Sequence, residues 1–215
     1  TAKGIVVANL PGSNTTAVVE YVLAALLHFR RGLAAVDTRL RADGWSQARA
    51  MGDASTELAG SVLGIVGVGA IGARVAAAAQ GLGLQVLGLT RRPDTLPSGV
   101  QGVDKATLFE RSDAIALCCP LNAQTRGLVD TAALARMKRH AVLINVARGP
   151  VLDTAAVLAA LREGRIGGAA MDVHDAQPLT GQEAAFAVPN LLLTPHLAGI
   201  TATSLRAMSE GAVHT

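Results

Sequence analysis

Aromatic residues are scarce in this chain, which has one Trp, one Tyr and three Phe among its 215 residues. Hydrophobic residues still make up 50% of it, so its interior must be built almost entirely from aliphatic side chains. Parallel strands that are covered on both faces by Ala- and Leu-rich helices have this kind of composition. At this length the chain can bury one large core or two small ones.

Long hydrophobic runs are also absent. Gly, Arg and Asp interrupt the apolar segments, and none approaches the roughly 20 residues that a helix needs to cross a bilayer. The residues from Thr1 onward show no signal-peptide pattern. The sequence therefore predicts a soluble protein with no membrane partner.

Cysteine is limited to the adjacent pair Cys118 and Cys119, which we expect inside a buried strand. Neighbouring side chains of a strand point to opposite faces, which disfavours a disulfide between the two. No Cys or His spacing suits a metal site, so we expect no metal. Two reduced thiols indicate a cytoplasmic protein.

The chain also has no large excess of charge of either sign, since its formal net charge is only +3. The basic residues are spread over the predicted helices and strand ends, with few aromatics among them. Nucleic-acid-binding surfaces instead gather basic residues on one face, so we expect no nucleic-acid partner. The positive charge suits small anions better, namely phosphates and a substrate carboxylate.

A glycine-rich turn lies between two predicted strands. Residues 61–66 form a short apolar run, Gly67-Val68-Gly69-Ala70-Ile71-Gly72 follows at once, and residues 84–89 form a second run. An alanine-rich segment reaching towards Gln80 separates the turn from the second strand and predicts a helix. Glycines at this spacing usually mark only a turn, but this strand–turn–helix–strand context predicts a nicotinamide dinucleotide site.

Each glycine of such a motif has its own role. We expect Gly67 to allow the tight turn, Gly69 to let a pyrophosphate approach the backbone, and Gly72 to let helix and strand pack closely. The pyrophosphate would lie at the helix N-terminus, where N–H groups lack partners and the positive end of the dipole favours anions.

The second strand ends at Thr90-Arg91-Arg92, about twenty residues past the glycines, where many dinucleotide-binding sequences place an acid. An acid there would bind the ribose 2′-hydroxyl of NAD. An arginine instead accommodates the 2′-phosphate of NADP through charge-assisted hydrogen bonds. No acid occurs before Asp94, so Arg91 and Arg92 predict NADP(H) rather than NAD, the alternative being a solvated basic loop.

Strands and helices alternate along the rest of the chain, which predicts a parallel, doubly wound α/β sheet of the Rossmann type. Asn14 or Thr15 is expected to cap the first long helix, and Gly164 to follow the end of a later one. Residues 37–56, which include Trp45, are polar and show no strand or helix period. The remaining expected elements are strands at 5–9, 113–119, 141–146, 168–173 and 190–194, a turn at 11–14, and helices at 16–31, 132–138, 153–162 and 204–210.

Polar residues follow the last strands of this predicted sheet. Asn145 and Arg148 come after one strand, Asp172 lies at the end of the next, and His196 follows Thr194 and Pro195. Ligands bind beyond the carboxyl ends of the strands in such sheets. Taken singly, Arg148 could be a solvated charge, Asp172 a loop cap, and His196 a structural histidine. Their occurrence at one edge favours a site.

At these residues the chain resembles the D-2-hydroxyacid dehydrogenase family, which includes phosphoglycerate dehydrogenases and glyoxylate/hydroxypyruvate reductases. The Asn-x-Ala-Arg-Gly and Thr-Pro-His segments together are specific to this family. The resemblance covers nearly the whole chain and is carried by residues 4–12, 58–72, 119–128, 144–153, 170–173 and 193–199.

The resemblance implies roles for these residues. Arg148 would bind the substrate carboxylate and polarise its C2 oxygen. His196 would be the general acid in keto-acid reduction and the base in the reverse direction. Hydride would pass between the nicotinamide and C2 of a small 2-keto or 2-hydroxy acid. The implied coenzyme contacts are Ala70, Ile71, Pro120, Thr125, Ala147, Asp172 and Gly199.

One catalytic position departs from the family pattern. Five residues after Asp172, where the family usually has Glu, this chain has Gln177. A carboxylate beside a histidine stabilises imidazolium, whereas an amide orients the ring without supplying charge. Related formate dehydrogenases carry Gln here and move hydride without proton transfer, so formate oxidation is an alternative. Assistance from His174 or Asp175 also stays open.

The length is a second departure, because family members place a substrate lobe before the coenzyme lobe. Residues 1–12 are expected to be the last strand of that lobe, 13–200 the dinucleotide-binding domain, and 201–215 the start of a helix returning to the lobe. Most of the substrate lobe is then absent, and the chain is a fragment or a coenzyme-binding remnant. The isolated chain is expected to bind coenzyme and turn over little or nothing.

The resemblance also implies a homodimer, with residues 37–56 as a candidate arm. A different class of protein remains open, namely a non-catalytic nucleotide-sensing protein such as the corepressors that share this fold. The sequence does not select one 2-hydroxy acid.

Overall fold

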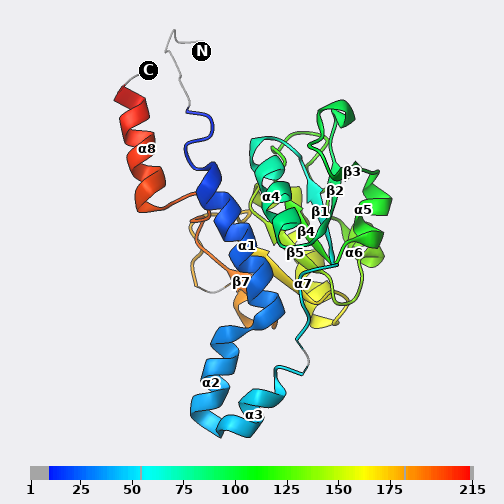
Figure 1. Ribbon diagram of the computed structural model, residues 1–215, viewed down its shortest axis with the longest axis vertical. Helices are drawn as coiled ribbons and strands as arrows, with labels where there is room; N and C mark the ends of the chain where they lie inside the picture. The colour runs from blue at the N-terminus through cyan, green and yellow to red at the C-terminus, as the bar shows by residue number, and fades with distance from the viewer. Residues whose placement is uncertain (1–9, 54, 182, 214–215) are drawn as a thin grey trace.

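Seven strands form one parallel sheet in the computed structural model, which describes residues 10–53, 55–181 and 183–213 (Figure 1). The strand order is β3-β2-β1-β4-β5-β6-β7. This is the doubly wound order, in which strands are added first on one side of β1 and then, from β4 on, on its other side. This confirms the expected α/β Rossmann fold. The strands are β1 Val62–Val66, β2 Gln85–Leu89, β3 Val100–Gly102, β4 Ala114–Leu117, β5 Val142–Asn145, β6 Gly168–Met171 and β7 Leu191–Leu193.

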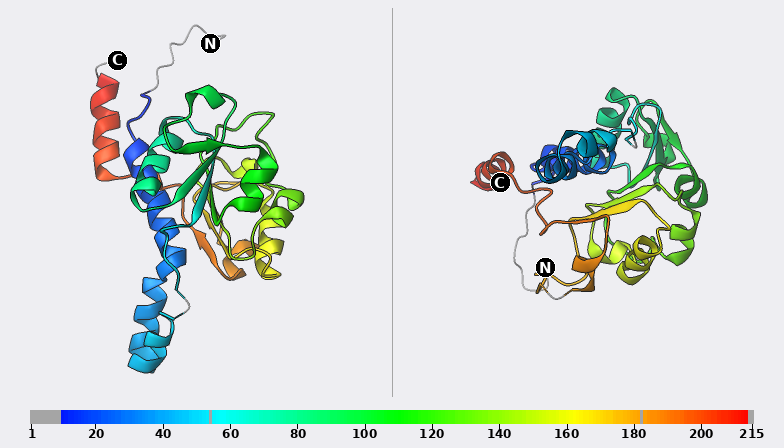
Figure 2. Two further views of the ribbon diagram at one scale, coloured as in Figure 1. Left: turned by 45° about the vertical axis from the view of Figure 1, so that its right-hand side comes forward. Right: turned by 90° about the horizontal axis from the view of Figure 1, so that it is seen from below.

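Helices cover both faces of this sheet (Figures 1 and 2). On one face α1 packs against α4, and on the other α5, α6 and α7 pack beside one another. The α-helices are α1 Thr15–Arg31, α2 Leu33–Asp43, α3 Trp45–Ala50, α4 Ala70–Gly81, α5 Lys105–Arg111, α6 Thr131–Arg136, α7 Thr154–Arg162 and α8 Ala202–Val213.

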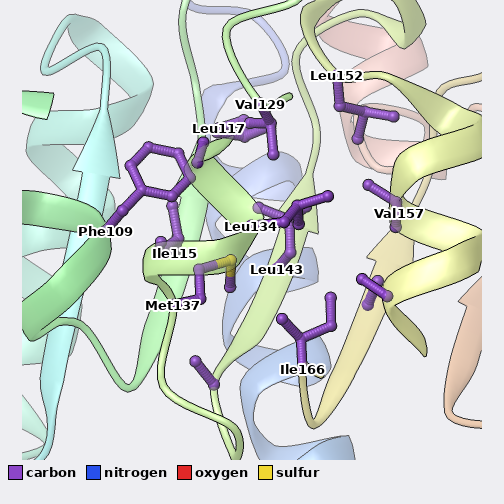
Figure 3. Close-up of a cluster of buried hydrophobic side chains, with 14 of the residues drawn as sticks. Phe109, Ile115, Leu117, Val129, Leu134, Met137, Leu143, Leu152, Val157 and Ile166 are labelled. Atoms are coloured by element: carbon purple, nitrogen blue, oxygen red, sulfur yellow. The ribbon is translucent and has the colours of Figure 1, made fainter. Parts of the chain in front are cut away.

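The sheet divides the interior into two aliphatic cores. Successive strand residues point to opposite faces, so Ala116 of β4 joins the core under α1 and α4 while Ile115 joins the core under α5 to α7. Phe109 of α5 is fully buried in the second core, where Figure 3 shows it among aliphatic side chains from α6, α7 and the strands. The composition thus fills both cores with few aromatics.

Three helices on one face begin with an aspartate cap. Asp104, Asp130 and Asp153 accept hydrogen bonds from backbone N–H groups in the first turns of α5, α6 and α7. The expected cap of α1 is half right, because Asn14 occupies the N-cap position but its side chain makes no capping hydrogen bond. Helix α4 has Gly69 at its N-cap position and therefore no side-chain cap.

Residues 37–56 showed no helical period in the sequence, yet the structure makes most of them helical. Helices α2 and α3 cover most of this segment and extend away from the sheet (Figure 1). Helix α2 buries none of its residues, and its sequence gives only a weak helical period. The ion pairs Arg39–Asp43 and Arg41–Asp37, each four residues apart, support it instead.

Other boundaries also differ from expectation. Strand β4 ends at Leu117, so Cys118 and Cys119 follow the strand instead of lying inside it, and both thiols are free. Strand β3 and helix α5 had not been predicted. The expected strand at 5–9 lies outside the described residues. In the part of the chain that the structure describes, no helix is long and apolar enough to span a membrane.

Candidate functional site

All seven strands run parallel, so the loops that follow them lie at one edge of the sheet, its carboxyl edge. The glycine turn follows β1, the arginine pair follows β2, and the two cysteines follow β4. Arg148, Asp172 and His196 follow β5, β6 and β7, which are neighbours in the sheet. The predicted coenzyme and catalytic residues therefore come from strands that end side by side.

The glycine turn has the geometry that the sequence predicted for it. Gly67 has a φ of +91°, and a Cβ there would lie 2.7 Å from Cys119 Cα and N. A Cβ on Gly72 would overlap the carbonyl oxygen of Gly67, so this glycine permits close packing of α4 on the turn. A Cβ on Gly69 would meet nothing within 4 Å, which leaves open space where a pyrophosphate would approach.

The N-terminus of α4 faces this open space without a cap. The backbone N–H groups of Ala70, Ile71 and Gly72 belong to the first turn, which has no intrahelical acceptors. Unpaired N–H groups and the positive end of the helix dipole favour an anion at this point.

A cavity of about 370 Å³ connects the glycine turn with the loops after β2 and β4. Its lining includes Gly67 and Gly69, the arginines Arg91 and Arg92, and the loop that contains Pro120 and Thr125. The predicted coenzyme contacts that do not line it are Ala70, Ile71, Gly72, Ala147, Asp172 and Gly199.

The two arginines at this cavity carry uncompensated charge. Arg91 and Arg92 are exposed, and neither guanidinium has a hydrogen-bond or ion-pair partner among the described residues. The Arg92 backbone N–H donates to the Thr90 hydroxyl at 3.2 Å, which fixes the turn that carries them. An anionic group in the cavity would therefore find two free guanidinium groups.

The loop after β4 holds its own shape. The Thr125 hydroxyl donates to the Pro120 carbonyl at 2.6 Å and accepts from the Asn122 N–H at 2.9 Å. The Asn122 side-chain oxygen accepts from the N–H groups of Gln124 and Thr125. Because its hydroxyl is already used, Thr125 would shape the cavity wall more than it would bind a ligand. The sequence had not indicated the part played by Asn122.

The two cysteines form an unreactive section of this wall. Burial raises the pKa of Cys118 to about 12, with a further contribution from neighbouring Cys119, and burial also raises the pKa of Cys119. Both thiols therefore stay protonated at neutral pH and provide soft apolar surface without acting as nucleophiles.

Arg148 lies on a turn that a buried amide holds in place. Asn145 is fully buried, its side-chain oxygen accepts from the Ala147 N–H at 3.0 Å, and its NH₂ donates to the Arg148 carbonyl at 3.1 Å. The Arg148 Nη1 donates to the Ala147 carbonyl at 2.6 Å, and its guanidinium has no carboxylate partner in the described ranges. The remaining guanidinium N–H groups are free for a ligand.

Asp172 fastens the loop that follows β7. The residue is 1% exposed, and its carboxylate accepts hydrogen bonds from the Thr194 hydroxyl at 2.6 Å and from the N–H groups of Leu197 at 2.8 Å and Ala198 at 2.9 Å. This is the loop-capping role that the sequence left open for Asp172. A contact with the nicotinamide stays a prediction.

His196 and Gln177 contact each other directly. The His196 Nδ1 lies 2.9 Å from the Gln177 side-chain oxygen, which can only accept, so Nδ1 carries a proton. The Gln177 NH₂ faces the His174 carbonyl at 3.4 Å, which agrees with this orientation of the amide. In the neutral ring, Nε2 is then the nitrogen with a free lone pair.

The two other candidates for assisting His196 bind elsewhere. The His174 Nε2 donates to the Thr194 carbonyl at 2.9 Å, and the Asp175 carboxylate accepts from the Thr154 hydroxyl at 2.6 Å. Gly199, a predicted coenzyme contact, packs against Asn14 at the start of α1, since a Cβ there would lie 2.6 Å from the Asn14 Nδ2. Its coenzyme contact stays a prediction.

Curated relatives match most of this chain. The (S)-sulfolactate dehydrogenase of Chromohalobacter salexigens is 40% identical over 194 residues, which are 88% of this chain and 62% of that protein. The glyoxylate reductase of Thermococcus litoralis is 36% identical over 98% of this chain and 65% of that protein. The chain thus spans less than two thirds of the length of either relative.

Solved structures share the fold closely. The TT0316 protein from Thermus thermophilus superposes with a TM-score of 0.88 at 34% identity, covering 99% of this chain and 67% of that one. A formate dehydrogenase from Staphylococcus aureus in complex with NAD has a TM-score of 0.85 at 29% identity over 94% and 60% of the two chains. An NADPH-dependent glyoxylate/hydroxypyruvate reductase from Sinorhizobium meliloti in complex with NADP and sulfate has a TM-score of 0.83 at 27% identity over 96% and 65%.

The family model for the D-isomer-specific 2-hydroxyacid dehydrogenase NAD-binding domain matches residues 23–198, which include the glycine turn, Arg148, Asp172 and His196. The chain therefore belongs to the D-2-hydroxyacid dehydrogenase family, of which it carries the NAD(P)-binding domain.

Proposed function

We propose that the protein containing this chain is an NADP(H)-preferring 2-hydroxyacid dehydrogenase that reduces small 2-keto acids. The observation that carries this proposal is the gathering of an uncapped helix N-terminus, two free arginines, Arg148 and the Gln177–His196 pair at one edge of the sheet. The first two features suit a phosphorylated coenzyme, and the others suit a carboxylate next to a proton donor.

Two features of the cavity support a dinucleotide. The α4 N-terminus would hold the pyrophosphate, because it has no side-chain cap and the space beside Gly69 is open. Arg91 and Arg92 would bind the 2′-phosphate of NADP(H), which is the basis for the preferred coenzyme. The bound coenzyme supplies the hydride that reduces C2 of the substrate.

The protein's own residues would orient the acid and exchange its proton. Arg148 would bind the substrate carboxylate with the guanidinium N–H groups that the Ala147 carbonyl leaves free. His196 would transfer a proton at Nε2, since Nδ1 is occupied by Gln177. Gln177 would set the ring orientation without adding charge.

A second activity is favoured by one observation, the neutral partner of His196. Because Gln177 supplies no negative charge to stabilise imidazolium, the site also suits hydride transfer that needs no proton donor, as in formate oxidation. Steady-state assays of the complete protein with glyoxylate, hydroxypyruvate, phosphohydroxypyruvate and formate separate the two activities. We expect 2-keto acid reduction with NADPH; turnover of formate alone would select the second activity, and binding without turnover would indicate a nucleotide sensor.

We also propose a homodimer that associates through α2 and α3. Leu33 is 69% and Trp45 is 75% exposed on helices that extend from the body, and hollows of about 790 and 240 Å³ lie on this pair of helices. A second copy would cover these apolar side chains, and light scattering on the purified protein measures the outcome.

The domain boundaries are proposals of the same kind. Residues 13–200 would form the coenzyme lobe, while 1–12 and 201–215 would belong with a substrate lobe. Helix α8 buries only Ser204, stands away from the sheet (Figure 2), and exposes Leu205 and Val213, which supports a partner for it. Two free cysteines are consistent with a cytoplasmic location.

A further inference from the structure

A chain of hydrogen bonds connects α1 with the loop of His196. The Tyr21 hydroxyl on α1 lies 2.7 Å from the Thr194 hydroxyl, which in turn donates to the Asp172 carboxylate at 2.6 Å. Thr194 uses its single hydroxyl proton on the carboxylate, so Tyr21 must donate to Thr194. The direction of the relay is thereby fixed from Tyr21 to Thr194 to Asp172.

The relay ends on the group that holds both sides of His196. The Asp172 carboxylate binds the N–H groups of Leu197 and Ala198, directly after the histidine. The Asp172 backbone carbonyl accepts the His196 N–H at 2.8 Å. Because the carboxylate also accepts from the Thr194 hydroxyl, its rotation would disturb the loop both before and after His196.

His196 needs such support because its backbone is strained. Its φ is +57°, a left-handed conformation that is uncommon and unfavourable for a residue other than glycine. Its ring is exposed and has one side-chain hydrogen bond among the described residues, to Gln177. The position of Nε2 thus depends mainly on the loop backbone.

Tyr21 is suited to remain a donor at all physiological pH values. Burial raises the pKa of its hydroxyl, the hydrogen bond to Thr194 lowers it by less than burial raises it, and the Asp172 charge adds a smaller increase, so that the pKa is raised overall. The same side chain packs against the core under α1 and α4, which keeps its hydroxyl in place.

We propose that Tyr21 and Thr194 are positioning residues of the reaction, which act through Asp172 to hold His196 in the geometry for proton transfer. This inference rests on the proposed function, in which His196 exchanges that proton. It assigns a role to a tyrosine that precedes the histidine loop by more than 170 residues in sequence.

The kinetic test uses variants of the complete protein that remove one hydroxyl each. Net hydrogen-bond contributions of about 0.5–1.5 kcal/mol correspond to losses of roughly 2- to 13-fold. We expect kcat for 2-keto acid reduction to fall about threefold in Tyr21→Phe and about tenfold in Thr194→Val, with the NADPH Kd unchanged in both. Thr194→Ser, which keeps the hydroxyl, should stay within about twofold of wild type, and Thr131→Val is the control at an exposed threonine outside the relay.

The double variant tests whether the two residues act in one chain. Because Tyr21 acts only through Thr194, Tyr21→Phe/Thr194→Val should match Thr194→Val alone instead of showing the product of the two losses. A simple product, or a loss confined to coenzyme affinity, would overturn the relay.

Amide hydrogen exchange gives a measurement that does not depend on turnover. We expect faster exchange at Leu197 and Ala198 in Tyr21→Phe and Thr194→Val, with Leu143 and Ile144 in the sheet unchanged. Unchanged exchange at Leu197 and Ala198, or faster exchange throughout, would contradict the positioning role. If exchange behaves as expected but wild type reduces no 2-keto acid, the proposed function fails, and with it the catalytic meaning of the relay.

Discussion

The two edges of the sheet differ in whether their charged side chains have partners of opposite charge. At the amino edge, Asp113 accepts hydrogen bonds from the Val62 N–H at 2.8 Å, from Lys138 at 2.7 Å and from His140 at 2.8 Å. At the carboxyl edge, Arg91, Arg92 and Arg148 have no carboxylate partner within the described ranges.

This difference distinguishes charges that stabilise the fold from charges that are available to bind a ligand. A paired carboxylate at the amino edge joins β1, β4 and the loop before β5. Free guanidinium groups at the other edge contribute nothing comparable to folding but suit phosphate and carboxylate groups. Substitutions at the carboxyl edge should therefore change function, and those at the amino edge should change stability.

The largest effect is expected at His196. His196→Ala removes the proton donor, so turnover of a 2-keto acid should fall by about 10² to 10⁴-fold while the NADPH Kd stays nearly unchanged. Steady-state kinetics and fluorescence titration measure the two quantities. An active His196→Ala protein would falsify the catalytic assignment.

The arginine pair should give the next largest effect. Arg91→Ala/Arg92→Ala removes the charge-assisted bonds to a 2′-phosphate, so NADPH affinity should fall about 10- to 100-fold while NADH affinity changes little. Arg111→Ala, at an exposed arginine on α5, is the matched control. Equal NADPH and NADH affinities in wild type would remove this account of coenzyme choice.

A moderate effect is expected from restoring the family's acid. Gln177→Glu places a negative charge beside Nδ1 of His196 and favours imidazolium, so 2-keto acid reduction should persist to a pH about one unit higher. Gln85→Glu makes the same substitution at the exposed amino end of β2 and should leave the profile unchanged. An unchanged profile in Gln177→Glu would count against proton transfer by this pair.

The smallest effect is expected at the amino edge. Burial alone would raise the pKa of Asp113, but hydrogen bonds from Lys138, His140 and the Val62 N–H lower it to about 2. Asp113→Asn should lower the free energy of unfolding by about 1 kcal/mol at neutral pH, after allowance for solvent screening, with kcat unchanged.

Because the pKa of Asp113 is lowered in the folded protein, its contribution to the free energy of unfolding depends on pH. The stabilisation is present above the ordinary carboxyl value near 4 and is lost as pH falls towards 2, so wild type and Asp113→Asn should converge over that range. Urea unfolding at pH 7 and pH 3 measures this. A difference in unfolding free energy between the two proteins that does not depend on pH would contradict this prediction. The control is Asp37→Asn, at an exposed ion pair on α2, which should lower the free energy of unfolding by less than Asp113→Asn does.

The sequence predicted the parts of the molecule that depend on local pattern. The core strands, the structural roles of Gly67 and Gly72 and the pairing of Gln177 with His196 all follow from short motifs, and the structure places them as expected. The role of Gly69 towards a pyrophosphate stays a prediction. Periodicity missed α2, which buries no face, and β3, which is three residues long. It extended β4 too far because the cavity wall at Cys118 and Cys119 is as apolar as the strand.

The relay could not be predicted in this way. Tyr21 and Thr194 are brought together only by the packing of α1 beside the sheet, and neither belongs to a short motif with that role. The family resemblance implied that Asp172 contacts the coenzyme, and this stays a prediction; the resemblance did not indicate that the Asp172 carboxylate also binds the backbone of the next loop.

The central claim is that the α4 N-terminus beside Gly69 holds a coenzyme pyrophosphate, and titration calorimetry of NADPH into wild type and Gly69→Ala tests it most directly. The added Cβ enters open space, so Gly69→Ala should fold with little loss of stability, yet bind NADPH at least about tenfold more weakly because the methyl occupies the pyrophosphate's position. Equal affinities for the two proteins, or no heat from wild type with either NADPH or NADH, would contradict the account.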